Sequence, residues 1–157
     1  MTELRPTETT SGEKGTGMKA EVFLPEDYTP AEDEPFMNER QLEWFRRELI
    51  RQKNELLSES RSTIAGLQDG TRNIPDIADR ASEETDRALE LRIRDRQRKL
   101  VAKIDSALRR IEEGEFGYCR ETGEPISLKR LVARPTTTLS LEAQERHERR
   151  EKVHRDE

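Results

Sequence analysis

Apolar side chains recur every seven residues in two long stretches of the chain, residues 37–68 and 77–113. In the first stretch the repeating positions are Leu42, Leu49, Leu56 and the polar Thr63. The second stretch has two offset series, Ile93, Leu100 and Ala107, and the polar Gln97 with Ile104 and Ile111. A heptad repeat places its members on one face of a helix, where a partner helix covers them. Because the break between the stretches is short, the pattern predicts an antiparallel coiled-coil hairpin over residues 37–113, with its tip near residues 69–86.

The ends of both helices carry capping signals. Asn38 can cap the first helix, and Gln41 three residues later completes a pair of the capping-box type. Pro75 ends the first stretch, Asp76 can cap the second, and Gly114 stops it. At 1.5 Å per residue, arms of about 30–35 residues would make a rod of roughly 50 Å.

The composition changes on either side of the hairpin. Residues 1–17 are rich in Thr, Gly, Ser and Glu and are predicted to be disordered, since they bury too little surface to offset the entropy of ordering. Residues 18–36 contain scattered apolar groups and are expected to dock on the globular part. Residues 114–139 predict a small knuckle that is too small to be stable alone. Residues 140–157 predict a polar C-terminal helix capped by Ser140.

The overall composition limits the possible classes. Of the 157 residues, 40% are charged and 31% are hydrophobic, which excludes one large globular core. The net charge of −5 argues against a general nucleic-acid binder. The chain contains no long apolar run and no signal-peptide layout at its start. Its single cysteine excludes an intrachain disulfide, and we expect a cytoplasmic protein without a membrane partner.

Charge is divided unevenly along the predicted rod. Residues 69–86 at the tip contain six acids and two bases, a local charge of −4. Residues 92–110 on the returning helix contain eight bases and two acids, a local charge of +6. The rod therefore has an acidic tip and a basic stem, so its two ends differ in charge and would face a partner surface differently.

Four short sequences occur in a specific order along the chain. They are PDIADRA at residues 75–81, LRIRDRQRKL at 91–100, FGYC at 116–119 and RLVARPT at 130–136. Together they resemble the DksA family of transcription factors over residues 24–151. The resemblance implies a mainly α fold, with a coiled-coil hairpin, a small zinc-finger-like knuckle and a C-terminal helix. It also implies a factor that binds RNA polymerase through its secondary channel and binds no DNA sequence directly.

The knuckle departs from the family pattern at its metal ligands. Zinc-binding members carry two Cys-x2-Cys pairs separated by seventeen residues. The corresponding positions of this chain are Cys119, Thr122, Ser140 and Ala143. A structural zinc needs about four nitrogen or sulfur ligands, which these residues do not supply. We therefore expect no metal and no cofactor, a knuckle held by apolar side chains, and two solvated histidines, His147 and His154.

The resemblance implies a role for the tip. It assigns Asp76, Asp79 and Ala81 to a motif that lies near the catalytic centre of the polymerase. Two carboxylates at positions i and i+3 share one face of a helical turn, where they can perturb a magnesium site or pair with a basic element. From the residues alone helix capping is the favoured interpretation, and the motif context reverses it.

Two further sets of residues take their roles from the resemblance. Arg92, Arg96 and Lys99 are the candidates for contact with the rim of the channel, against the alternative of a solvated helix face. Leu100, Lys103 and Arg134 are the candidates for a pocket shared with the polymerase that binds the alarmone ppGpp. At another position where the resemblance implies a lysine, this chain has Gln144. Pro135 predicts an extended backbone at Arg134.

The sequence thus predicts a monomeric, non-enzymatic regulator of the stringent response that alters the stability of promoter open complexes together with ppGpp. One alternative is a Gre-like transcript cleavage factor, whose tip acids would hold a second magnesium ion. Another is a coiled-coil scaffold for a different partner. A direct DNA binder is disfavoured, because the chain is acidic and shows no recognition helix.

Overall fold

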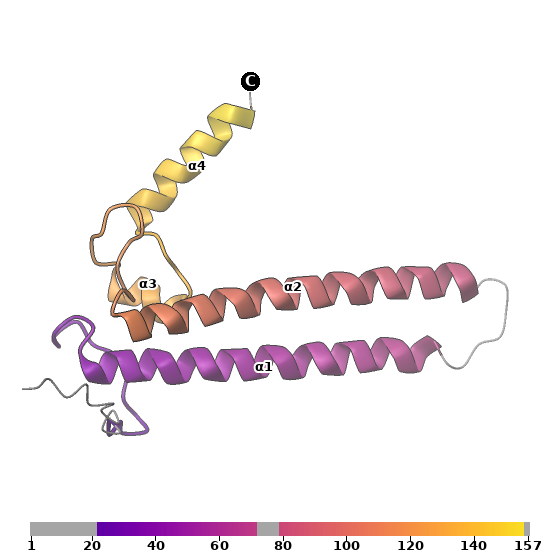
Figure 1. Ribbon diagram of the computed structural model, residues 1–157, viewed down its shortest axis with the longest axis horizontal. Helices are drawn as coiled ribbons and strands as arrows, with labels where there is room; N and C mark the ends of the chain where they lie inside the picture. Colours follow the sequence, from indigo (N-terminus) through magenta and orange to yellow (C-terminus); the bar gives the residue numbers. More distant parts are fainter. Residues whose placement is uncertain (1–21, 72–78, 156–157) are drawn as a thin grey trace, which may run out of the picture.

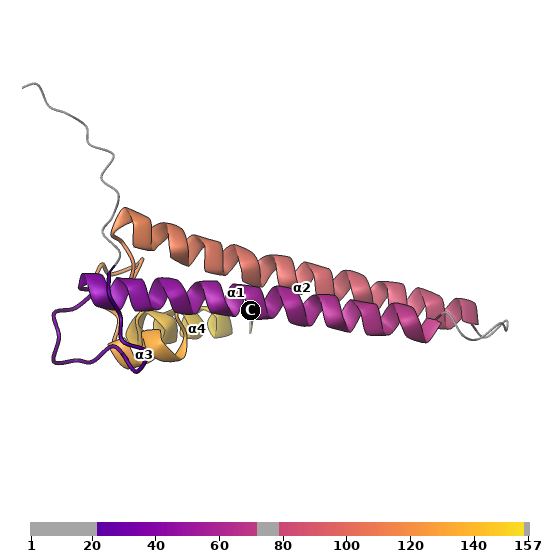
Figure 2. The same ribbon diagram turned by 90° about the horizontal axis from the view of Figure 1, so that it is seen from below.

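The protein is described by a computed structural model that covers residues 22–71 and 79–155. It contains four described helices: α1 (Glu39–Thr71), α2 (Asp79–Glu113), α3 (Leu128–Ala133) and α4 (Leu141–Arg155). The helices α1 and α2 lie side by side along the long axis (Figure 1 and Figure 2). At one end lie α3 and the start of α4, and α4 projects from there away from the hairpin (Figure 1). We call this end, where α1 begins and α2 ends, the base. The predicted mainly α fold class is confirmed.

The end of the first helix differs from the sequence prediction. α1 continues to Thr71, three residues past the predicted end, because Gly66 lies in open space and weakens a helix without breaking it. The predicted start of the second helix, with Asp76 as its cap, lies outside the described residues. No described helix has the length and apolar character needed to cross a membrane.

The start of α1 is fixed by hydrogen bonds that reach back along the chain. The Asn38 side chain accepts a bond from the Gln41 backbone N–H at 2.8 Å. The buried Gln41 side chain accepts a bond from the Met37 backbone N–H at 2.9 Å and donates one to the Ala31 carbonyl at 3.1 Å. Gln41 therefore ties the segment before α1 to the first turn of the helix.

The base contains the hydrophobic core. Its buried side chains are Phe45, Leu49, Ile104, Ala107, Phe116, Cys119, Ile126, Leu128, Leu131 and Ala143. They come from all four helices and from the loop between α2 and α3, so one core joins the hairpin to the globular part. The rings of Phe45 and Phe116 lie 5.1 Å apart and link α1 to that loop. Tyr118, one of the larger knuckle side chains, is 37% exposed and contacts Phe36 edge-on.

The end of α2 is a Schellman motif. Gly114 has a φ of 77°, and its N–H donates to the Ile111 carbonyl at 3.3 Å. The Glu115 N–H donates to the Arg110 carbonyl at 2.9 Å. A left-handed glycine satisfies the last helical carbonyls in this way and turns the chain sharply. The turn directs the chain from α2 into the knuckle.

The seam between α1 and α2 becomes thinner with distance from the base. Beyond Leu49 on α1 and before Ile104 on α2, the buried side chain among those described is that of Ser60. A groove of about 240 Å³ lies beside Ser60 and Gln97. We call this part of the hairpin, the described residues 50–69 and 80–103, the distal half.

Candidate functional site

The tip residues fall partly outside the described structure. Asp76 lies among the residues that are not described, and Asp79 is the first residue of α2. Ala81 follows in the first turn of α2 and is exposed. The role expected for these three residues therefore stays a prediction. Glu83 and Glu84, also exposed, add negative charge to the start of α2.

The three rim candidates, Arg92, Arg96 and Lys99, share one face of α2 with Lys103, which is a candidate for the ppGpp pocket. With 3.6 residues per turn, Arg92, Arg96, Lys99 and Lys103 fall within about 60° of one another around the helix. All four side chains are exposed. We call this set the basic stripe.

Members of the basic stripe differ in how they are paired. The Lys99 ammonium lies 2.9 Å from a carboxylate oxygen of Asp95. This hydrogen bond and the charge of Lys99 lower the pKa of the Asp95 carboxyl. Arg92 and Arg96 have no ion-pair partner within the described part of the chain, whereas the neighbouring Arg94 pairs with Glu90 at 2.7 Å. The two unpaired guanidinium groups are therefore free to bind an acidic partner surface.

The residues expected to bind ppGpp lie on two elements. Leu100 is half-buried in the seam, and Lys103 is exposed one turn closer to the base. Arg134 follows α3 with φ −143° and ψ 85°, the extended backbone that Pro135 favours. Gln144 on α4 donates a side-chain hydrogen bond to Glu148 at 2.9 Å.

The four positions of the family's zinc ligands have other structural roles in this chain. The Thr122 hydroxyl accepts a bond from the Glu124 N–H at 3.3 Å and closes the knuckle turn. The Ser140 hydroxyl accepts a bond from the Ala143 N–H at 3.3 Å and caps α4. Ala143 itself is fully buried in the core.

Cys119 is the one thiol at these positions. It is buried, and its N–H donates to the Glu124 carbonyl at 2.8 Å. Burial raises the pKa of the Cys119 thiol, but hydrogen bonds from the Thr122 hydroxyl and from backbone N–H groups, including that of Ser140, lower it to about 6. The turn thus favours a thiolate although the other three thiolates are absent.

These residues do not fit a zinc ion. A structural zinc site of this type needs four thiolates. These positions offer one thiol, two hydroxyls that bond to backbone N–H groups, and one methyl group. Among the described residues, no three His, Cys, Asp or Glu side chains lie close enough to hold a metal. His147 and His154 are exposed on α4, and His147 lies 3.2 Å from Glu151.

Comparison with known proteins decides the family. A family model for the N-terminal domain of the DnaK suppressor protein DksA matches residues 41–111, and a model for the prokaryotic dksA/traR C4-type zinc finger matches residues 114–149. The "RNA polymerase-binding transcription factor DksA" of Caulobacter vibrioides (strain NA1000 / CB15N) is 69% identical over 130 residues, which cover 83% of this chain and 92% of the relative. The chain belongs to the DksA family.

Other DksA proteins are similar over nearly the same length. The "RNA polymerase-binding transcription factor DksA" of Escherichia coli (strain K12) is 44% identical over 127 residues, covering 81% of this chain and 84% of the relative. The solved structure of the transcription factor DksA2 from Pseudomonas aeruginosa is 46% identical and superposes with a TM-score of 0.67. The match covers 74% of this chain and 90% of that structure. This DksA-family chain carries a single cysteine, although it matches the C4-type zinc-finger model.

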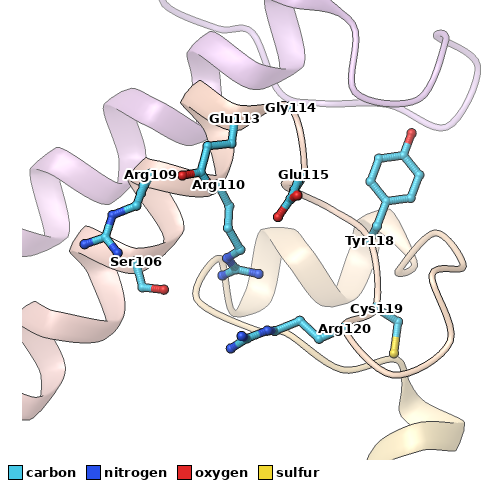
Figure 3. A pocket seen from close by; sticks show the side chains of 9 residues that line it. All are labelled: Ser106, Arg109, Arg110, Glu113, Gly114, Glu115, Tyr118, Cys119 and Arg120. Carbon is cyan, nitrogen blue, oxygen red and sulfur yellow. The ribbon is translucent and has the colours of Figure 1, made fainter.

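Sequence reasoning missed one polar feature of the base. Arg110 counted only as one base among eight on the stem, yet its side chain is 8% exposed and borders a cavity of about 460 Å³ (Figure 3). The local pattern gave no signal, because Arg110 lies on the same helical face as the exposed Lys103. Arg110 is buried by the knuckle loop that follows α2, and the helical pattern of α2 does not reveal that contact.

Proposed function

We propose that the chain is a transcription factor that binds RNA polymerase through its secondary channel and regulates promoter activity without binding DNA. Membership of a family whose similar proteins are named RNA polymerase-binding transcription factors carries this proposal. The shape supports it, because a long thin hairpin with its globular part at one end can enter a channel up to that end (Figure 1). In this view the protein acts in the cytoplasm as a monomer and is not an enzyme.

The tip is the part that would act. Asp76, Asp79 and Ala81 would reach the neighbourhood of the polymerase active site and shift the balance between closed and open promoter complexes. Carboxylates there can compete for a basic polymerase element or perturb bound magnesium. Ala81 is small enough to allow close packing. Promoters with short-lived open complexes would then be inhibited.

Transcription in vitro tests the tip. With purified polymerase and a promoter that forms short-lived open complexes, Asp79→Asn should lose most of the inhibition while it still binds polymerase. Glu83→Gln, which removes an exposed acid from the next turn of α2, is the matched control and should inhibit as the wild type does. Equal inhibition by Asp79→Asn and wild type would refute the tip assignment, and shortened transcripts in stalled complexes would favour a cleavage factor.

The basic stripe would hold the protein at the rim of the channel. Arg92 and Arg96 are exposed and free of described ion pairs, and Lys99 can exchange its exposed pair with Asp95 for a partner carboxylate. Replacing Arg92 and Arg96 by alanine should weaken polymerase binding, most strongly at low salt, since exposed charges act mainly through long-range attraction. Arg94→Ala is the matched control, because Arg94 already pairs with Glu90.

The alarmone ppGpp would bind between this protein and polymerase, at Leu100, Lys103 and Arg134. The two cations suit phosphate groups, and arginine can hold them through two parallel hydrogen bonds. Lys103→Ala should remove the ppGpp-dependent part of the inhibition and leave the ppGpp-independent part unchanged. Gln144→Lys, which restores the family's cation on α4, should strengthen the ppGpp response. A loss of both parts in Lys103→Ala would refute the assignment.

The knuckle would fold without zinc. Its three substituted positions are occupied by two hydroxyl caps and a buried methyl group. Protein purified without chelator should contain far less than one zinc per chain, and EDTA should leave its thermal unfolding unchanged. A stoichiometric zinc ion would contradict this proposal.

A further inference from the structure

The cavity beside Arg110 lies where the end of α2 faces the knuckle loop. Its volume is about 460 Å³, and its lining is drawn from residues 106–120. Figure 3 shows the Arg110 side chain extending from α2 into this space, with the guanidinium group of Arg120 facing it from the loop. Arg109 and Ser106 border it along α2, while the Tyr118 ring and the Cys119 sulfur lie on the far side of the loop.

The Arg110 guanidinium is buried without an acceptor. Its Nε, Nη1 and Nη2 atoms are inaccessible, and none has a hydrogen-bond partner within the described part of the chain. A guanidinium group has five N–H donors and stays charged, so a buried one needs acceptors. Leaving such a charge unpaired is strongly unfavourable compared with its exposure to water.

The backbone holds this cation in place. The Arg110 carbonyl accepts bonds from the N–H groups of Glu115 and Phe116, at 2.9 and 3.1 Å. The Phe116 ring lies 5.9 Å from the Arg110 guanidinium carbon. The Schellman turn that ends α2 therefore also fixes the position of the charged group, which binds a ligand at a lower entropic cost when it is held in advance.

The charges around the cavity favour a compact anion. Burial lowers the pKa of Arg110, the charge of Arg120 lowers it further, and the charge of Glu115 acts in the opposite direction. Arg109, Arg110 and Arg120 balance the acids Glu113 and Glu115 and the thiolate that Cys119 favours, so the lining as a whole is about neutral. Its positive part is the facing pair of guanidinium groups of Arg110 and Arg120, because the Cys119 sulfur lies on the far side of the loop. An anion between Arg110 and Arg120 would relieve both the missing acceptors and their mutual repulsion. Because the Arg110 nitrogens are closed off from solvent, binding would require the exposed Arg120 side chain to move aside and close over the anion.

We propose that this cavity is a binding site for a phosphate or diphosphate group, held by Arg110 and Arg120. Tetrahedral oxyanions offer the parallel acceptors that a guanidinium group recognises. The site belongs to the free protein, requires no polymerase, and uses none of Leu100, Lys103 and Arg134. It therefore stands or falls separately from the proposed function.

Thermal unfolding of the free protein tests the site. Unfolding is followed by circular dichroism in inorganic phosphate, in pyrophosphate, and in sodium chloride of equal ionic strength. At a ligand concentration about tenfold above the dissociation constant, linkage predicts that Tm rises by roughly 3–6 °C relative to chloride. A direct readout is the NMR signal of the Arg110 Nε–H, which should shift on titration with phosphate.

Three variants complete the test. Arg110→Met should abolish the phosphate-dependent rise, and its Tm in chloride should be no lower than that of the wild type, because an unpaired buried charge has been removed. Arg120→Gln, at an exposed position, should reduce the rise severalfold. Arg98→Gln makes the same charge change at an exposed site on α2 and should retain the full rise.

Two results would overturn the proposal. One is an equal rise in wild type and Arg110→Met, which would make the effect a general one of the salt. The other is no rise and no Nε–H shift in the wild type with either anion, which would mean that water alone satisfies the Arg110 donors.

Discussion

The base and the distal half of the hairpin use the same two helices but are held together differently. At the base Phe45, Leu49, Ile104 and Ala107 are buried and continue into the core of the knuckle. In the distal half the described seam is half-exposed, with a polar position at Ser60 and a groove beside it. Stability is therefore concentrated at the base, and the distal half is held mainly by its attachment to the base and by helix propensity.

The largest difference should appear when one seam residue is truncated in each region. Phe45→Ala removes a fully buried ring that contacts Phe116, and it should lower the free energy of unfolding by about 3–5 kcal/mol. Ile93→Ala, at a half-buried distal position, should lower it by only about 1–2 kcal/mol. Urea unfolding followed by circular dichroism measures both, and equal losses would mean that the hairpin is uniformly packed.

The base should also carry a pH dependence that the distal half lacks. The Cys119 pKa is lowered from 9.0 to about 6, so the folded state favours the thiolate more than the unfolded chain does. Its contribution is complete above about pH 9 and is lost as the pH falls towards 6. Urea unfolding at several pH values should show stability rising from pH 6 to 9 in the wild type.

Cys119→Ala is the control for that dependence. It lacks the thiol, so its stability should rise much less over the same interval. Parallel curves for the two proteins would show that other groups of the molecule cause the effect.

Two glycines sharpen the contrast by opposite effects. Gly117 at the base has a φ of 91°, and an added Cβ would lie 2.9 Å from the Met37 side chain. Gly117→Ala should therefore lower the free energy of unfolding by about 1–3 kcal/mol. Gly66→Ala in the distal half meets nothing within 4 Å and should raise it by about 0.5–1 kcal/mol. A loss of stability in Gly66→Ala would mean that the distal half is packed more tightly than described.

The smallest effect is expected from the ion pair that crosses the seam. The Lys53 ammonium lies 2.7 Å from Asp105, and both side chains are partly exposed. Lys53→Gln should lower the free energy of unfolding by less than about 1 kcal/mol, and added salt should reduce the difference. A salt-independent loss above 2 kcal/mol would place this pair among the main supports of the hairpin.

The sequence predicted the features that depend on neighbouring residues. The heptad spacing from Leu42 to Leu56 and from Ile93 to Ala107 indicated a coiled-coil hairpin, and the confirmed fold class rests on it. The cap at Asn38 and the stop at Gly114 are local chemistry, and both were read from a few residues.

The features that the sequence did not predict depend on distant elements. Arg110 shares a helical face with solvated bases, and only the knuckle loop that crosses it makes it buried. Ala143 was interpreted as a lost ligand and Cys119 as the one retained thiol, but both lie in the core, Cys119 in the knuckle turn and Ala143 on α4. Their small size among larger neighbours was the one available signal.

Gln41 has a mechanical consequence. Its side-chain amide bonds to the Met37 N–H and to the Ala31 carbonyl, so residues 31–37 are linked to the first turn of α1 at the base. The hairpin is then a long arm that is fixed at its base. A lateral force on the tip would therefore be transmitted to residues 31–37, because no flexible hinge separates them from α1.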